Sequence, residues 1–129
     1  MAAFIRAHTS PDDNVLVWGS QYATVNMLPG RRSPTCYVMQ MALFNQGWAE
    51  RGGPEFLGNL MAHPPALILD SSPTLYPGSG PPIAATTNPW GSSPHGVSAA
   101  WASVYAYLHE NYRSQGRVDF APWWPVYIS

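Results

Sequence analysis

Runs of consecutive apolar residues alternate along the chain with segments in which apolar residues recur at helical spacing. Residues 15–18 (VLVW) and 66–70 (ALILD) are the strongest runs, and turn-forming residues flank both. Unbroken apolar runs of this length are typical of strands buried on both faces, as parallel strands are. The pattern therefore predicts two central strands, with a weaker third strand over residues 35–39.

Helical spacing predicts helices around these strands. Residues 2–8 read as the last turns of a helix, and residues 21–28 are a short helix candidate. Residues 44–53 are irregular, and the next helix is expected to begin at Pro54, because proline suits the first helical position. Its apolar face would consist of Phe56, Leu57, Leu60 and Met61.

The clearest helical stripe lies in the last third of the chain. Ser93 and Pro94 suit the cap and first position of this helix. Residues 117–120 and 125–128 then predict two terminal strands around a Trp-Trp pair. The stripe itself consists of Val97, Trp101, Val104 and Leu108 and runs toward Tyr112.

This order of elements predicts an α/β fold. Strands that alternate with helices imply a mostly parallel sheet covered on both faces, so we expect a three-layer, Rossmann-like architecture closed by a C-terminal antiparallel hairpin. The length suits one domain over residues 1–129. Residues 71–96, of which 18 of 26 are Pro, Gly, Ser or Thr, form a long loop within it that is either functional or mobile.

Composition narrows the function classes. The chain has six basic residues, all arginine, and seven acidic residues, so its net charge is close to zero. Because it also lacks a run of basic residues, a nucleic-acid partner is not expected. The single cysteine, Cys36, excludes an internal disulfide, and its apolar neighbours predict a buried, inert thiol. The four histidines share no metal-ligand spacing, and phosphate-binding glycine motifs are lacking, so we expect no metal and no cofactor. No apolar run approaches the roughly 20 residues that span a bilayer.

Asp70 is the first polar candidate because it ends a buried strand. In open α/β sheets, ligands bind beyond the carboxyl ends of the strands, where Gly19 would also lie. The carboxylate could instead cap Ser71, Ser72 or the following turn. A stand-alone enzyme would need a pocket that joins Asp70 to a histidine, which the sequence spacing gives no reason to expect.

Arg31 and Arg32 are the second candidate, since two adjacent arginines form the main local positive charge. Their guanidinium groups could hold a phosphate or an acidic sugar through paired hydrogen bonds. Alternatively, they pair with Asp12, Asp13 or Asp70 and fix the loop.

Trp90, Trp123 and Trp124 lie in proline-rich segments outside the helical stripes. Exposed indoles could stack on sugar rings or rest at a membrane interface, whereas buried ones would fill the ends of a small core. Exposed tryptophans would favour the alternative function, a carbohydrate-binding or protein-interaction module that uses loop aromatics.

Several short segments, taken together in order and spacing, resemble a known family. They resemble the C-terminal soluble domain of bacterial dolichyl-phosphate-mannose–protein mannosyltransferase-like membrane glycosyltransferases, relatives of the aminoarabinose transferases. The segments are residues 11–19 (PDDNVLVWG), 28–34 (LPGRRSP), 56–70 (from FL to HPPALILD), 107–113 (from YL to NYR) and 125–128 (PVYI).

The resemblance implies that the chain is a fragment of a cell-membrane protein. Membrane-spanning helices would precede Ala2, and this domain would lie on the extracytoplasmic face against the membrane portion of its own parent chain. In that family a sugar passes from a polyprenyl-phosphate carrier to an acceptor, with an acidic base in the membrane part, so no catalytic residue is expected here. The domain would be non-catalytic and help to position the acceptor or the lipid-linked carrier, with Arg31, Arg32 and Asp70 as the polar candidates.

Overall fold

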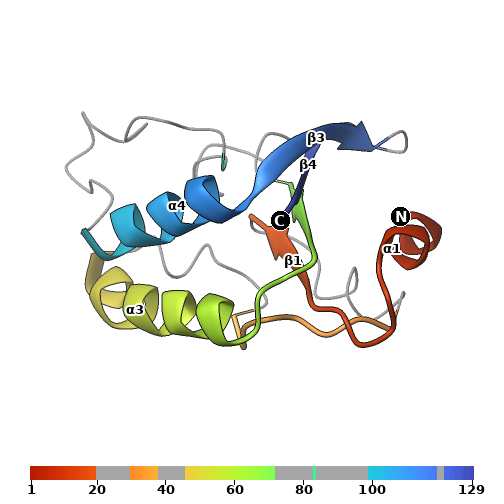
Figure 1. The fold of residues 1–129 in the computed structure, drawn as a ribbon. Helices are drawn as coiled ribbons and strands as arrows, with labels where there is room; N and C mark the ends of the chain where they lie inside the picture. Colours follow the sequence, from red (N-terminus) through yellow and green to blue (C-terminus); the bar gives the residue numbers. More distant parts are fainter. Residues whose placement is uncertain (20–29, 38–45, 72–82, 84–98, 119–120) are drawn as a thin grey trace.

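The computed structural model places four strands in one sheet and three helices beside it, within the residues that it describes (Figure 1). The described residues are 1–19, 30–37, 46–71, 83, 99–118 and 121–129. The helices are α1 (Ala2–His8), α3 (Gln46–Ala62) and α4 (Ala99–Asn111). The strands are β1 (Val15–Trp18), β2 (Leu67–Asp70), β3 (Arg113–Val118) and β4 (Ala121–Ile128).

The sheet is mixed, with strand order β1-β2-β4-β3. β1 and β2 are parallel, with Val15 opposite Leu67 and Trp18 opposite Asp70. β4 pairs antiparallel with β2 on one side and with β3 on the other. β1, β2 and β3 therefore run in one direction, and β4 alone opposes them.

The expectation of a mostly parallel, three-layer Rossmann-like sheet is wrong. Of the three strand pairs in the described part, only one is parallel, because β4 lies between β2 and β3 instead of at the edge. The alternation of strands and helices predicts crossover connections between parallel strands. It does not indicate which strand of the C-terminal hairpin pairs with β2. The expected strand over residues 35–39 also fails in its described part, since residues 35 and 36 belong to a bend and residue 37 has no regular structure.

Other elements agree with the sequence. β1 and β2 are buried along their whole length, as their apolar runs predict, and β2 begins one residue later than expected. The C-terminal antiparallel hairpin is confirmed, although both of its strands are longer than predicted. The short helix expected over residues 21–28, the start of the last helix at residues 93–94 and nearly all of the 71–96 segment lie outside the described residues.

Helix α3 begins at Gln46, eight positions before the Pro54 start that the sequence favours. A buried stripe of Ala49, Gly53, Phe56 and Leu60 continues through the proline, so small residues extend the packed face by two turns. Pro54 removes the hydrogen bond to the carbonyl of Glu50, and both residues are exposed, so water can satisfy that carbonyl. Met61, expected on the apolar face, is 62% exposed.

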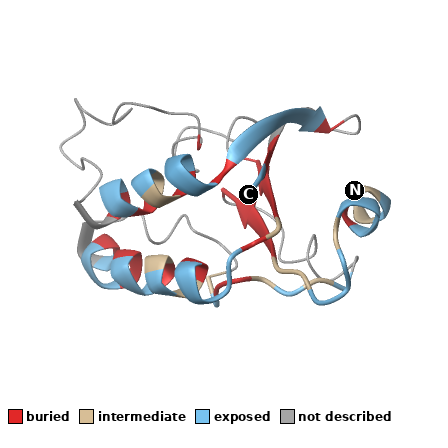
Figure 2. Ribbon diagram, viewed as in Figure 1, coloured by how far each residue is buried: buried red, intermediate tan, exposed pale blue. Residues whose placement is uncertain are grey.

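Each face of the sheet has its own apolar core (Figure 2). Alternate residues point to opposite faces of a strand, so Leu16, Trp18 and Ile68 pack toward α3 and α4. There Trp18 makes edge contacts with Trp101 and Phe56, with ring centroids 5.8 and 6.1 Å apart. Figure 2 shows buried positions lining the inner sides of these elements. The second core, on the α1 face, contains Ile5, Val15, Val17, Leu67, Leu69, Val118 and Val126.

Candidate functional site

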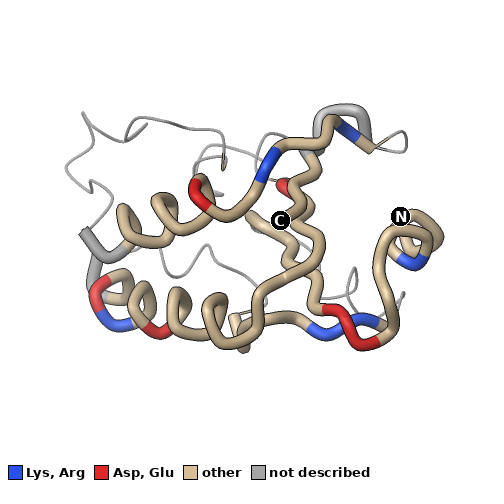
Figure 3. Tube along the Cα trace, viewed as in Figure 1, with Lys and Arg blue, Asp and Glu red and all other residues tan. Residues whose placement is uncertain are grey.

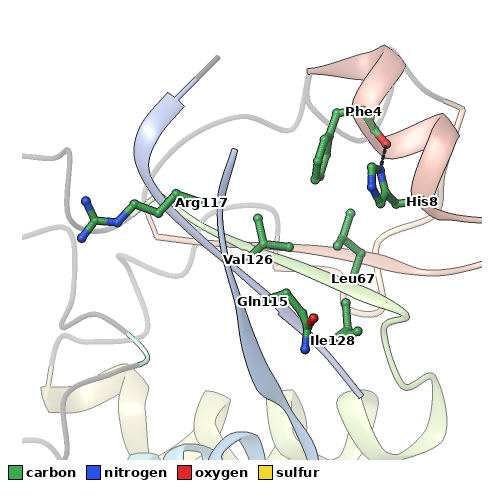
Figure 4. Close-up of a pocket in the computed structure, with 7 residues that line it drawn as sticks. All are labelled: Phe4, His8, Leu67, Gln115, Arg117, Val126 and Ile128. Carbon is green, nitrogen blue, oxygen red and sulfur yellow. Dashed lines mark hydrogen bonds between the residues drawn. The ribbon is translucent and has the colours of Figure 1, made fainter. Parts of the chain in front are cut away.

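A groove of about 360 Å³ lies between α1 and the sheet (Figure 4). Small-molecule sites have volumes of about 300–1,000 Å³, so this groove suits a small ligand. We call it the α1–sheet groove. Its described lining consists of Phe4, His8, Leu67, Gln115, Arg117, Val126 and Ile128.

Three aliphatic side chains form the floor of the groove. Leu67 and Val126 come from the adjacent strands β2 and β4 and are almost fully buried, while Ile128 is 37% exposed. Gln115 and Arg117 are exposed residues of the edge strand β3, beside β4. The groove therefore joins an apolar floor to a polar rim.

Phe4 and His8 form the wall on the α1 side. They are one helical turn apart, and their rings stack with centroids 4.1 Å apart. His8 Nδ1 lies 2.8 Å from the carbonyl oxygen of Phe4 and donates its proton to it (Figure 4). In neutral His8 this bond places the proton on Nδ1 and leaves Nε2 as an acceptor.

Arg31 fixes the end of α1 that carries this wall. Its Nε donates to Thr9 Oγ1 at 2.9 Å, and its Nη2 donates to the Thr9 carbonyl at 2.8 Å. Thr9 Oγ1 in turn donates to the Ile5 carbonyl at 2.6 Å, inside the helix. Arg31 is thus a positioning residue for α1, whereas the side chain of the neighbouring Arg32 is exposed.

The structure places the predicted polar candidates at opposite ends of the parallel strand pair. The Arg32 carbonyl accepts the N–H of Val15, at the start of β1. Asp70 is the last residue of β2 and lies opposite Trp18, at the other end of the pair. Arg31, Arg32 and Asp70 therefore do not converge on one ligand.

Asp70 occupies the interior on the α3–α4 side of the sheet, the face opposite the groove. It is fully buried, and its Oδ2 accepts the backbone N–H of Ile83 at 2.9 Å. His109 Nε2 of α4 donates to the carbonyl of the same Ile83. Asp70 and His109 are thus linked through Ile83, and each side chain binds a backbone group of that residue. The carboxylate thus joins the segment that follows β2 through residue 83.

Two tyrosines lie close enough to Asp70 to be affected by its charge. Burial, with the negative charge of Asp70 as a second cause, raises the pKa of Tyr127 from 10.0 to about 12. The same two causes raise the pKa of Tyr105 well above its usual value. Both phenols therefore remain neutral over the physiological range, and the region around Asp70 is a packed polar interior.

Ser71 closes the carboxyl end of the parallel pair. Its backbone N–H and its Oγ both donate to the carbonyl of Trp18, at 2.9 and 2.7 Å. The position where open α/β sheets bind ligands is thus bridged by hydrogen bonds between the ends of β1 and β2.

The remaining candidates have mixed outcomes. Cys36 is exposed, so the expectation of a buried thiol is wrong, and its Sγ lies 3.9 Å from Glu55 Oε1. Trp123 and Trp124 lie in β4, but only their backbone is described, and their side chains lie outside the described part. Trp90 lies outside the described residues altogether. The use of loop aromatics for binding therefore stays a prediction.

The sequence pointed to Arg117 only as the start of a strand, and it did not single out Phe4 and His8 as a pair. Their spacing of four residues on a helix was a usable signal. The groove itself combines α1 with β2 from the middle of the sequence and with β3 and β4 from its last part, which no local pattern indicates.

Charged positions are sparse along the described trace, and basic ones lie beside acidic ones near α1 and α3 (Figure 3). Among the described residues no three His, Cys, Asp or Glu side chains are grouped to hold a metal ion. None of the helices in the described part is long and apolar enough to cross a membrane.

Comparisons with protein families, curated proteins and solved structures found no match.

Proposed function

We propose that this chain is a non-catalytic binding domain of a membrane glycosyltransferase that uses a polyprenyl-phosphate carrier, and that it positions the carrier or the acceptor. The family resemblance of the five sequence segments suggests the parent enzyme. The observation that carries the binding role is the α1–sheet groove, with its apolar floor and its rim of Gln115 and Arg117.

The chemistry of the groove favours binding over catalysis. Its seven described lining residues include no carboxylate, hydroxyl or thiol. His8 would therefore be the single general acid or base among them. Asp70 points to the opposite face of the sheet, where its carboxylate is occupied by the Ile83 N–H. The polar groups nearest to a ligand are therefore suited to orient it.

The proposal is tested by measuring sugar transfer by the full-length parent protein with Arg117→Gln and Gln115→Ala changes in this domain. Both residues are exposed, so the fold should tolerate the changes. We expect a raised KM for carrier or acceptor with kcat largely retained, because the lost contacts orient a ligand and do not touch the reacting bond. Arg51→Gln, an exposed change on α3, is the matched control.

Two results would overturn the proposal. Unaltered kinetics in both groove variants would remove the positioning role. A native gene that encodes this chain without membrane-spanning segments would remove the parent enzyme.

A further inference from the structure

We infer that the α1–sheet groove takes an amphipathic anion, a short aliphatic chain that ends in a carboxylate or a phosphate. The inference rests on the proposed binding role of the same groove and names the chemical class of its ligand. It follows from the order in which apolar and charged groups line the groove.

The apolar part of the groove is continuous. Leu67, Val126 and Ile128 are contributed by neighbouring strands, and the ring of Phe4 faces them from α1 (Figure 4). A flexible aliphatic chain lying in the groove would remove its own apolar surface from water together with that of Ile128 and Phe4, because Leu67 and Val126 are already almost fully buried. This burial is the main favourable contribution to such binding. A fully hydroxylated sugar would leave its hydroxyl groups against aliphatic side chains without hydrogen-bond partners.

The charged part lies at one end of the groove. The Arg117 side chain leaves β3 beside Val126 and extends its guanidinium away from the Phe4–His8 wall (Figure 4). Its planar group can give two parallel hydrogen bonds to a carboxylate or a phosphate. Because the seven described lining residues include no acidic group, an anionic head is not repelled there.

These two parts fix the orientation of the ligand. The head group is bound by Arg117, and the chain runs over Val126 and Leu67 toward Phe4 (Figure 4). The stacked His8 ring closes that end, because its Nδ1–H is already bonded to the Phe4 carbonyl. A longer aliphatic chain should therefore bind more tightly until the chain is long enough to reach Phe4. Further lengthening should not raise the affinity.

The test is a titration of the 129-residue chain with octanoate and octyl phosphate, followed by the NMR signals of methyl groups. We expect the methyl signals of Leu67, Val126 and Ile128 to shift, and those of Leu60 and Leu108 in the other core to stay. Arg117→Gln should weaken binding of both anions by roughly tenfold, the loss of a charge-assisted pair of hydrogen bonds. Arg51→Gln should leave the affinity unchanged.

Four further probes distinguish the ways in which the two proposals can fail. Octanol should bind more weakly than octanoate, and equal binding would overturn the role of the anion. Inorganic phosphate that shifts the same methyl signals as strongly as octyl phosphate would overturn the role of the chain. If a methyl glycoside or a short peptide shifts the groove signals and the anions do not, the ligand class is wrong while the binding role stands. If no probe shifts them, both proposals fail.

Discussion

The carboxylate of Asp70 binds the backbone N–H of Ile83 across 13 positions of sequence, at 2.9 Å in a fully buried setting. The Ile83 side chain is itself buried in the core on the α3–α4 face, and His109 binds the carbonyl of the same residue. One residue of the long segment after β2 is therefore held by its N–H, its carbonyl and its side chain. The polar residue that marks the end of β2 attaches this segment to the sheet.

Replacing Asp70 by alanine should destabilise the fold by about 1–3 kcal/mol, because the buried N–H of Ile83 loses its acceptor. Urea denaturation measures the free energy of unfolding. Asp13→Ala is the control, since its Oδ2 accepts the Ser10 N–H at 2.7 Å in an exposed turn and should cost about 1 kcal/mol or less. Equal losses in the two variants would contradict the anchoring role of Asp70.

Stability should fall as pH rises through the range of tyrosine ionisation. The folded chain holds the pKa of Tyr127 at about 12, against 10.0 for the free group. The neutral phenol therefore favours the folded state fully below pH 10, and this contribution is lost as pH rises toward 12. Tyr105 and Tyr112, whose pKa values burial also raises, add to the loss.

The measurement is the free energy of unfolding as a function of alkaline pH, with tyrosinate absorbance recorded in parallel. Tyr127→Phe removes one ionising group and should make the decline shallower, whatever it does to stability at neutral pH. An unchanged slope in this variant would contradict the raised pKa of Tyr127.

Arg31 and Arg32 form a matched pair for testing what the adjacent arginines do. Arg31→Ala removes two hydrogen bonds to Thr9 and should cost about 1–3 kcal/mol of stability. It should also broaden the NMR signals of Phe4 and His8, because the end of α1 is released. Arg32→Ala removes only an exposed side chain, since the Arg32 contact to Val15 uses the backbone carbonyl, and should change stability by about 0.5 kcal/mol or less.

Arg31→Lys distinguishes geometry from charge. A lysine keeps the positive charge but cannot supply the two divergent donors that reach Thr9 Oγ1 and the Thr9 carbonyl, so we expect little rescue. Full rescue by lysine would show that charge alone holds α1.

Particular residues show why some of the structure was predictable and some was not. The bounds of β1 follow from a local run of four apolar residues, and local patterns of that kind fix a strand directly. The start of α3 was missed because Pro54 carries a strong start signal, whereas Ala49 and Gly53 bury a helix face without large apolar side chains. Tertiary packing here outweighs propensity.

Non-local pairings lay beyond the sequence pattern. Nothing in the residues around Asp70 indicates that its partner is the N–H of Ile83, or that β4 is inserted beside β2. Asp70 was correctly placed at a strand end, but the strand end is bridged by Ser71 and the groove lies on the other face. The candidate site depends on which distant segments meet, and local patterns of apolar and polar residues do not indicate that.

Two exposed glycines should respond in opposite ways to alanine. Gly116 lies at an irregularity between β3 and β4 with φ of 113°, a conformation that alanine adopts only with strain, although nothing lies within 4 Å of the added methyl group. Gly116→Ala should therefore destabilise the chain by about 1–3 kcal/mol through the backbone alone. Gly58 lies inside α3 with equally open space, so Gly58→Ala should stabilise it by roughly 0.5–1 kcal/mol. Thermal unfolding of both variants measures the two shifts. A stabilised Gly116→Ala would contradict the positive φ of Gly116 in the edge strand, and with it the position of Gln115 and Arg117 at the groove.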